Sequence, residues 1–453
     1  MTETVLNSNS SCFTLAIGGD TIINRTVDDK RDRDVAAICG LFRDADLAYA
    51  NCETLFHDYD GLGVYPAVEA GWSYMRSSPR IAMELRRLGF RLMSTANNHA
   101  FDYSYGGLFS TLAALDAAGI AHAGAGPDLA HARVPAFVDA GRFRVALVSM
   151  TTTSTLASRA GMPHDGIPGR PGVNPLRFHF TADATNMQRV LDLHRDFGWW
   201  IARIGEREWQ INPPGLHNTI TRYVLQDEPG MSRVLDERDV AANLRAIRNA
   251  RAYADIVLVH IHNHEWDQDL GTQYPASFMP EFARRAVEAG ASVVVAQGGH
   301  APFRGVEVHH GAPIFYDPGD LFSMASTIER YPHDFYERHD LLLDRPLAEA
   351  LTVDSLKARG KYSTEMVQNP EGGTRQGRGQ NGFVPLVHFD EQARPVSVDL
   401  HPFEHRHGAK ADIGLPFRAS DAQADMLIAR LAELSQPFGT DIKSSDGIAR
   451  IAF

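Results

Sequence analysis

The sequence predicts a layered α/β fold, and two observations lead to this prediction. Short apolar runs, typical of buried strands, alternate along much of the chain with stretches whose apolar residues recur at helical spacing. In two places, pairs of apolar runs separated by turn residues indicate hairpins. Strand–helix alternation is typical of a sheet covered by helices, and 453 residues are enough for a large core with accessory segments.

The N-terminal part of the chain repeats a strand and a helix three times. Pro79 favours a helix start and Gly89 a helix stop, so the segment between them is predicted to be helical. The other elements are assigned from their apolar spacing alone. The expected strands are 13–17, 47–50 and 91–95, and the expected helices are 34–43, 79–88 and 106–118.

The same alternation continues towards the C-terminus. We expect two strands within 134–150, joined by a turn at 139–142, and a hairpin over 306–316. One amphipathic helix at 420–434 lies near the C-terminus. Between these segments, helices at 236–253 and 280–289 each lead into a strand, at 256–260 and 292–296.

Residues 155–230 break the alternation. They contain Pro-Gly pairs and several tryptophans, including Trp199 and Trp200. We interpret them as an insertion that forms a lid or a substrate-binding module; the alternative is that the tryptophans only pack the insertion onto the core. We therefore expect a core of residues 1–323, a variable and polar excursion at 324–380, and a C-terminal segment at 381–453 that packs back on the core.

Composition excludes several classes of protein. The formal net charge of −12 argues against a nucleic-acid-binding surface, which requires a basic stripe. The N-terminus, MTETVLNSNSSCF, lacks the features of a signal peptide, and no apolar run is long enough to predict a membrane helix. Three cysteines without a C-x-x-C pair predict neither a disulfide framework nor a cysteine zinc site. We expect a cytoplasmic protein, and the sequence does not indicate its oligomeric state.

Polar side chains gather at the ends of five predicted strands. In an α/β sheet such ends converge on one crevice, so we expect these side chains to lie close together. Carboxylates, an amide and imidazoles form a mixed ligand set that suits Mn, Zn or Fe better than Ca or Mg. The clusters are Gly19-Asp20, Asn51-Cys52-Glu53, Asn97-Asn98-His99, His260 to Glu265 with His262 and His264, and Gly298-Gly299-His300.

Each cluster has a simpler interpretation when taken alone. Asp20 can cap a helix, the pair Asn97-Asn98 can form a turn, and His262 can be a packed imidazole. Their joint occurrence at five separate strand ends favours a metal or catalytic centre. Asp102 is expected to cap the helix that follows it, with orientation of an imidazole as the alternative.

The order of these motifs resembles that of the CapA family, which is named for poly-γ-glutamate capsule synthesis. The shared pattern is G-D, N-x-E, A-N-N-H-x-x-D-x-x-x-x-G, a strand ending in His, G-x-H and I-x-Y-x-x-G-D. It covers roughly residues 13–323 and returns at 414–416 and 434–440. The resemblance implies a calcineurin-like metallophosphatase sandwich, with helices outside two layered sheets and with insertions.

The resemblance also implies roles for individual residues. The implied metal ligands are Asp20, Glu53, Asn98, His262 and His300. His99 would face the substrate beside them, and His260, two residues before His262 on the same strand face, would bind substrate. The implied cofactor is a divalent metal ion such as Mn, Zn or Fe, at one or two sites.

Two motifs depart from metallophosphatases that hold two metals. The usual D-x-H is here Asp20-Thr21-Ile22, and the usual G-H-x-H is Gly299-His300-Ala301-Pro302. Either one metal position is lost or weakened, or another residue such as His264 or His309 replaces the missing ligand.

We therefore expect an enzyme that acts on a peptide or polyamide backbone. A metal polarises the carbonyl, and acid–base groups epimerise the Cα. His99 would work from one strand end and His264 or Glu265 from another, with Trp199 and Trp200 of the insertion binding substrate. The alternatives are phosphoester hydrolysis and a component of capsule synthesis or export that has no catalytic activity.

Overall fold

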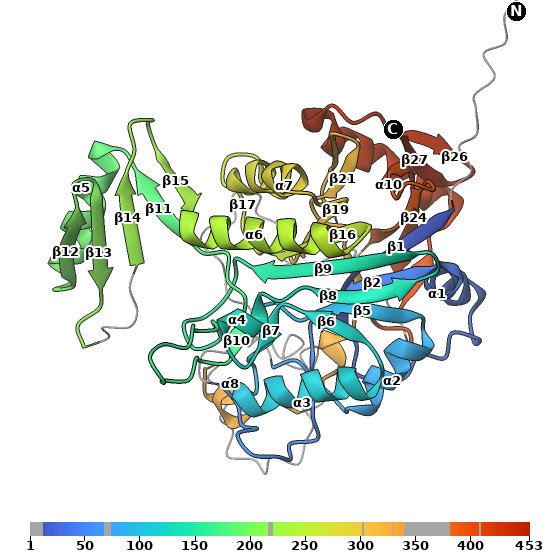
Figure 1. Cartoon of the computed structure of the whole chain (residues 1–453), viewed down its shortest axis with the longest axis horizontal. Coiled ribbons are helices and arrows are strands. Elements are labelled where there is room, and N and C mark those ends of the chain that lie inside the picture. Colours follow the sequence, from blue (N-terminus) through green and yellow to red (C-terminus); the bar gives the residue numbers. More distant parts are fainter. Residues whose placement is uncertain are drawn as a thin grey trace, which may run out of the picture.

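The protein contains two large β-sheets packed face to face, with helices on both outer faces (Figure 1). The computed structural model describes residues 12–67, 74–215, 221–300, 303–328, 330–338, 381–406 and 409–453. The predicted α/β class is confirmed. No helix in these ranges is both long and apolar enough to cross a membrane.

The first sheet joins the N-terminal and C-terminal parts of the chain. Its strand order is β26-β27-β24-β23-β1-β2-β5-β6, with β22 also paired to β1 and β25 to β24. The strands are β1 (Phe13–Ile22), β2 (Leu47–Asn51), β5 (Phe90–Ser94), β6 (Ala121–Ala123), β22 (Asp320–Ser323), β23 (Gly382–Phe389), β24 (Pro395–His405), β25 (Pro416–Arg418), β26 (Lys443–Ser445) and β27 (Ile448–Ala452). Strands β1, β2, β5 and β6 are parallel, so their carboxyl ends lie on one edge.

The second sheet has the order β20-β21-β19-β16-β9-β8. Strand β16 runs parallel to both β9 and β19, so these three carboxyl ends also lie together. The strands are β8 (Ala136–Ala140), β9 (Phe143–Thr151), β16 (Ile256–His262), β19 (Val293–Gln297), β20 (Val306–His309) and β21 (Ala312–Phe315). The inner faces of both sheets share one apolar core, in which Leu15 and Tyr49 of the first sheet join Leu147 and Leu258 of the second.

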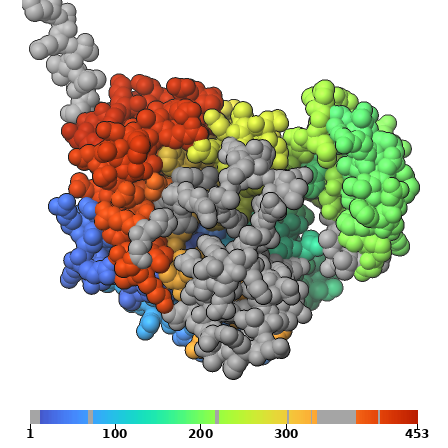
Figure 2. Space-filling model, turned by 180° about the vertical axis from the view of Figure 1, so that it is seen from behind, coloured from blue at the N-terminus to red at the C-terminus, as the bar shows by residue number. Residues whose placement is uncertain are grey.

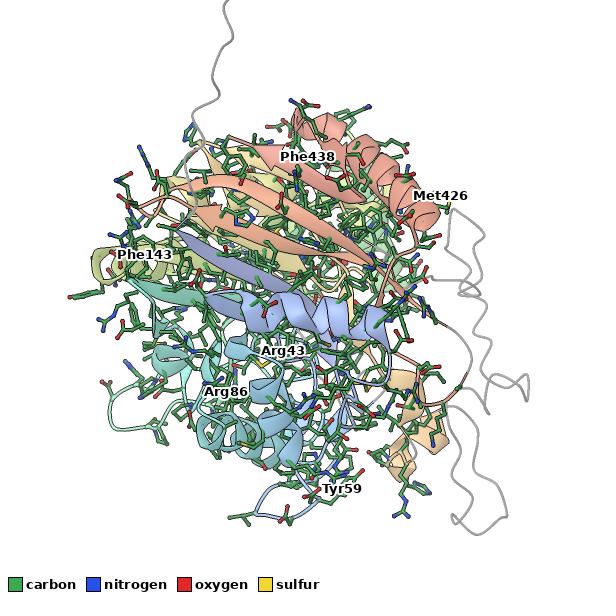
Figure 3. All side chains as sticks on the ribbon, turned by 90° about the vertical axis from the view of Figure 1, so that its right-hand side faces the viewer. Arg43, Tyr59, Arg86, Phe143, Met426 and Phe438 are labelled. Carbon is green, nitrogen blue, oxygen red and sulfur yellow. The ribbon has the colours of Figure 1, made fainter. Side chains whose placement is uncertain are left out.

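Amphipathic helices cover the outer faces of the sheets. Helices α1 (Arg33–Asp44), α2 (Arg80–Arg87) and α3 (Ser104–Ala117) pack on the first sheet, and α6 (Glu237–Tyr253) and α7 (Phe278–Glu288) pack on the second. Helix α10 (Asp421–Ser435) contributes to the core between the sheets. Figure 3 shows Met426 of α10 near the upper right edge of that view, and Arg43 of α1 and Arg86 of α2 lower down towards its centre.

The insertion has a five-stranded sheet of its own, in the order β12-β13-β14-β11-β15. It forms a lobe beside the core, shown in green in Figure 2. Helix α5 (Ala184–Asp196) packs on β11 (Phe178–Ala182), β12 (Trp200–Gly205) and β14 (Thr221–Leu225), and β13 (Glu208–Asn212) and β15 (Met231–Leu235) complete the sheet. Phe178 pairs with Leu235, so the chain leaves and re-enters the core at one point.

Short elements complete the described chain. They are β3 (Leu55–Phe56), β4 (Arg76–Ser77), β7 (Ala125–Gly126), α4 (Leu129–Ala132), β10 (Gly172–Val173), β17 (Trp266–Asp267), β18 (Gly271–Pro275), η1 (Ala325–Thr327), α8 (His333–Arg338) and η2 (Gln436–Phe438). Both η1 and α8 lie within the predicted excursion at 324–380, most of which is outside the described residues. The predicted C-terminal segment supplies β23 to β27 of the first sheet.

The core elements lie within a few residues of their predicted positions, with two differences at the functional edge. Strand β1 continues past the predicted end at Ile17 to Ile22, because β22 pairs with its last residues. Strand β16 continues to His262, because β9 pairs with it along its whole length and β19 pairs with Leu258 to His262. Asp20 and His262 therefore lie within strands and not in the loops that follow.

Gly19 allows β1 and β22 to approach each other beside Asp20. A Cβ at position 19 would lie 1.6 Å from the backbone oxygen of Gly319. We predict that Gly19→Ala destabilises the protein by about 1–3 kcal/mol, since the backbone must move to admit the methyl group. The measurement is urea-induced unfolding followed by circular dichroism.

Gly40, inside α1, is the matched control for this substitution. The nearest atom to a Cβ there is the Asp44 carboxylate at 3.9 Å. Gly40→Ala should therefore stabilise the protein by about 0.5–1 kcal/mol, the usual gain of alanine over glycine in a helix. Equal stability of Gly19→Ala and the parent protein would show that β1 and β22 are not constrained at this point.

Candidate metal centre

Side chains from both sheets converge where the parallel strands end. Nε2 of His262 on β16 lies 2.8 Å from Oδ1 of Asn98, 3.1 Å from Nε2 of His264 and 3.8 Å from Oε1 of Glu53. Its Nδ1 lies 3.9 Å from Oδ1 of Asp20. Asn98 and Glu53 come from the loops after β5 and β2, so the centre lies between the two sheets.

Two carboxylates in this cluster are buried without enough hydrogen-bond donors. Among the described residues, neither oxygen of Glu53 has a hydrogen-bond partner, and Asp20 has one, the Asn51 amide that donates to its Oδ1 at 2.7 Å. Burial, followed by the charge of Asp320, raises the pKa of Asp20 to about 7. Burial and Asp20 raise the pKa of Glu53 well above its usual value. Without a cation these groups are costly in their charged form.

The imidazoles of His262 and His264 are neutral, and their Nε2 atoms face each other. Burial and the neighbouring imidazoles hold the pKa of both histidines well below the usual value. Neutral imidazole is the form that binds metal ions. The two Nε2 atoms lie 3.1 Å apart, which is consistent with both rings facing one ion.

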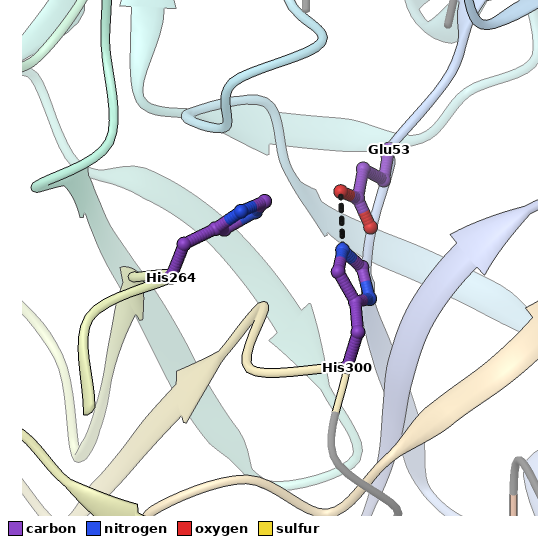
Figure 4. Close-up of side chains that lie close together, drawn as sticks. All are labelled: Glu53, His264 and His300. Atoms are coloured by element: carbon purple, nitrogen blue, oxygen red, sulfur yellow. Dashed lines mark ion pairs between the residues drawn. The ribbon is translucent and has the colours of Figure 1, made fainter. Parts of the chain in front are cut away.

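His300 reaches the same carboxylate from the loop after β19. Its Nε2 lies 3.7 Å from Oε1 of Glu53 (Figure 4), and its Nδ1 lies 3.2 Å from Asp320 on β22. Burial lowers the pKa of His300, but Asp320 and then Asp20 outweigh burial and raise it to about 9. Gly298 permits this approach, because a Cβ there would lie 2.7 Å from the His262 ring.

His99 also approaches Glu53 and is oriented by Asp102. Nε2 of His99 is 3.9 Å from Oε1 of Glu53, and its Nδ1 is 2.7 Å from Oδ2 of Asp102. The same Asp102 oxygen accepts a hydrogen bond from the backbone N–H of Met75 at 2.7 Å. The prediction that Asp102 caps α3 is wrong: Tyr103 is the N-cap and makes no side-chain capping bond.

The residues present fit a divalent cation. Three overlapping groups have ligand atoms within 4.8 Å of one another: Asp20, Glu53 and His262; Glu53, His264 and His300; and Asp20, His300 and Asp320. The orphaned oxygens of Asp20 and Glu53 are the independent indication, because a cation would satisfy them. The mixed carboxylate, amide and imidazole set suits Mn, Zn or Fe.

The structure brings all five predicted ligands together, but not every other predicted site residue. The Glu265 carboxylate points to the Thr152 and Thr153 hydroxyls, at 2.5 and 3.5 Å, so it is held by the loop after β9. His260 is enclosed between the sheets, with Nδ1 2.7 Å from Ser94 Oγ, so direct substrate contact by His260 is not supported.

The two tryptophans and His309 also lie elsewhere. Trp199 packs against His194 of α5. Trp200 is 64% exposed at the start of β12, which Figure 1 places on the outer side of the insertion. Their role in substrate binding stays a prediction. His309 lies 3.5 Å from Glu288 and stacks on His310, so it does not replace the missing ligand.

Asp320 and Asn51 also belong to the site, although neither was assigned a role from the sequence. Asp320 pairs with Asp20 across β1 and β22, which explains how it reaches His300. Asn51 connects Asp20 with Nδ1 of His262, which lies 3.3 Å from the Asn51 amide. Asp320 is the last residue of the I-x-Y-x-x-G-D motif, and its place in that motif could have identified it as a site residue from the sequence.

Comparison with known proteins agrees with this arrangement. The sequence profile described as "Bacterial capsule synthesis protein PGA_cap" matches residues 14–325, which contain every candidate ligand. The chain belongs to this family. The resemblance to CapA proteins is thereby confirmed.

Two relatives of this PGA_cap chain come from Sinorhizobium fredii. The uncharacterized proteins y4sH and y4uA are each 30% identical to it over 452 residues, covering 97% of this chain and 93% of theirs. A probable polyglutamine synthesis accessory protein of Mycobacterium tuberculosis is 29% identical over 246 residues. That match covers 54% of this chain and 48% of the mycobacterial protein.

We predict that metal affinity rises with pH. In the metal-free protein Asp20 is protonated below about pH 7 and His300 below about pH 9. A metal ion must displace these protons, so affinity should increase by about tenfold per pH unit for each proton displaced. Titration calorimetry with Mn²⁺ between pH 6 and pH 8, in two buffers of different ionisation enthalpy, measures both affinity and protons released.

Asp20→Asn is the control for this prediction. The amide cannot bind a proton in this range, so the variant should bind Mn²⁺ more weakly and release fewer protons. A pH-independent affinity in the parent protein would contradict the assignment of Asp20 and His300 as ligands.

Proposed function

We propose that this PGA_cap family protein is a metal-dependent enzyme that acts on a peptide or polyamide backbone, and that its reaction is epimerisation at a Cα. The supporting observation is that two imidazoles reach one buried carboxylate from different sheets. His99 follows β5 of the first sheet and His264 follows β16 of the second, and both lie near Glu53.

In this proposal the ligands divide between two neighbouring positions. Asp20, Glu53, Asn98 and His262 would hold one ion, and His300 with Asp320 would extend the site on the side of β22. A bound divalent ion supplies Lewis acidity towards a substrate carbonyl oxygen. Glu53, which belongs to two of the three candidate groups, is placed to serve both positions.

The proton transfers are assigned to the two imidazoles. One imidazole removes the Cα proton, and the electrons of the C–H bond delocalise into the adjacent carbonyl. The other imidazole delivers a proton to the opposite face of the carbon, so the reaction has no net redox change or leaving group. Asp102 fixes the His99 ring for this role by accepting from its Nδ1–H at 2.7 Å.

Phosphoester hydrolysis is the second candidate, and a specific observation favours it. Asp320 and His264 join the cluster, so the ligands missing from the sequence motifs are partly replaced, and the overlapping groups are enough for two ions. Two neighbouring ions can stabilise both oxygens of an in-line displacement. The sandwich of two sheets with helices outside is also consistent with the calcineurin-like metallophosphatase fold implied by the family resemblance.

We further propose a class of substrate and a cellular location. The mycobacterial relative is named a probable polyglutamine synthesis accessory protein, and this name supports a substrate with an amide backbone. We also propose a cytoplasmic location, where a peptide precursor would be accessible before export. A role in capsule synthesis or export without catalysis is the outcome if no turnover is found.

One experiment separates these functions. The purified protein is incubated in D₂O with short peptides and, separately, with p-nitrophenyl phosphate, and its metal content is measured by mass spectrometry. Epimerisation predicts deuterium at a peptide Cα; phosphatase turnover with two bound metals would favour hydrolysis. Absence of both activities in the metal-loaded protein would contradict an enzymatic role.

Two neighbouring substitutions test the assigned roles. Asn98→Ala should lower metal occupancy and activity together, because its amide oxygen lies 2.8 Å from the metal-facing nitrogen of His262. His99→Ala should keep the metal but lose about 10²–10⁴ in rate, the usual contribution of a positioned acid or base. If His99→Ala strips the metal, or if it retains near-full turnover, the role given to His99 is wrong.

Removal of the insertion lobe tests its role in substrate selection. Phe180 and Arg233 are paired across the antiparallel strands β11 and β15, so a two-residue Asn-Gly turn can join them and close a hairpin. This turn would replace residues 181–232. We expect the shortened protein to keep its metal content and lose exchange at the peptide Cα. Unchanged exchange kinetics would show that the lobe does not bind the substrate.

A further inference from the structure

A cavity lined with basic side chains lies beside the loop that follows β1. Its volume is about 760 Å³, within the usual range for small-molecule sites. Charged residues of its wall are Arg25, Arg31, Arg76, Arg330 and Lys410, with Asp28 as the acid among them. This local excess of positive charge contrasts with the net charge of −12 of the whole chain.

Two of the arginines are not neutralised by a carboxylate. Arg31 and Arg76 form ion pairs with Asp412 and Asp58. Arg25 instead donates to neutral oxygens, to Thr327 Oγ1 at 3.2 Å and to the backbone oxygen of Ile413 at 2.5 Å.

Arg330 lines the cavity from the segment after η1. It is exposed, and among the described residues it has no ion pair or hydrogen bond. Burial and the charge of Arg31 lower the pKa of Arg25, as expected where a guanidinium is partly desolvated beside another cation. The cavity therefore combines a half-buried arginine and an available one, both without a counterion.

The cavity is separate from the metal centre. None of its lining residues is a candidate metal ligand. Its wall also contains apolar surface: Ile328 belongs to a cluster with Ile22, Leu55 and Tyr103, and the Tyr59 ring lies under the Arg76 guanidinium at 4.6 Å. Tyr59 lies at the end of the molecule opposite Phe438 in Figure 3.

We propose that this cavity binds an organic anion through a carboxylate or phosphate group held by Arg25 and Arg330. A guanidinium fork matches both oxyanions and can bind them with two parallel hydrogen bonds. Tyr59, Ile328 and Leu415 provide the apolar side that an organic anion, unlike an inorganic one, would use. This site is additional to the metal centre and does not depend on the reaction proposed for it.

The test is calorimetric binding of two probes, tri-L-glutamate and ADP, to the full chain at low and high salt. We expect one of them to bind, with an affinity that falls as ionic strength rises. The probe that binds identifies the source of the oxyanion, as carboxylate or phosphate. Arg330→Gln should weaken its binding at least about threefold, and Asp28→Asn should strengthen it, because exposed charge pairs contribute in this range.

Control variants assign the binding to the cavity. Arg189→Gln, on α5 of the insertion, removes one positive charge outside the cavity and should leave the affinity unchanged. His262→Ala, at the metal centre, should also retain probe binding. The proposal is overturned if neither probe binds, if Arg330→Gln and Asp28→Asn leave the affinity unchanged, or if His262→Ala abolishes it.

Discussion

The burial of two carboxylates between the sheets is the constraint on which the rest of the centre depends. Asp20 and Glu53 are almost completely enclosed, and three of their four oxygens have no hydrogen-bond partner in the described part of the chain. Such groups persist only if they are protonated or if a cation compensates them. The imidazoles of His262 and His264 are neutral and offer lone pairs, while His300 supplies a positive charge until a metal ion displaces its proton, so the cluster can receive a cation.

The backbone of β1 places Asp20 in this position. The register between β1 and β2 shifts between Ile17 and Asp20, and the register between β1 and β22 shifts again directly after Asp20. Such irregularities re-aim side chains at the edge of a sheet. Gly18 and Gly19 lie within the shifted segment, where β22 and β2 approach too closely for a side chain. Strand β1 therefore pairs with its neighbours in the sheet and also positions Asp20 as a candidate ligand.

The sequence predicted the core elements well because their apolar periodicity is local. It also predicted that Asp20, Glu53, Asn98, His262 and His300 meet, because strand ends share an edge and the family motifs fix their order. Asp320 was missed as a ligand because its approach to His300 depends on the pairing of β22 with β1, a contact between residues 300 positions apart. The hydrogen bonds of the Glu265 carboxylate could not be predicted because Thr152 and Thr153 come from a distant loop, and its catalytic role stays a prediction.

In the segment Asn97 to Asp102, some side chains hold the loop in place and others face the candidate metal centre. The Asn97 amide donates to the Cys52 backbone oxygen at 2.8 Å and so ties the loop after β5 to the loop that carries Glu53. Asn98 and His99 then face different partners, His262 and Glu53. Asp102 accepts from the Met75 backbone and His99 with one oxygen, so the ring is oriented by a group that is itself fixed. An amide that faces His262 and an imidazole that faces Glu53 therefore lie on adjacent residues and can be given separate roles.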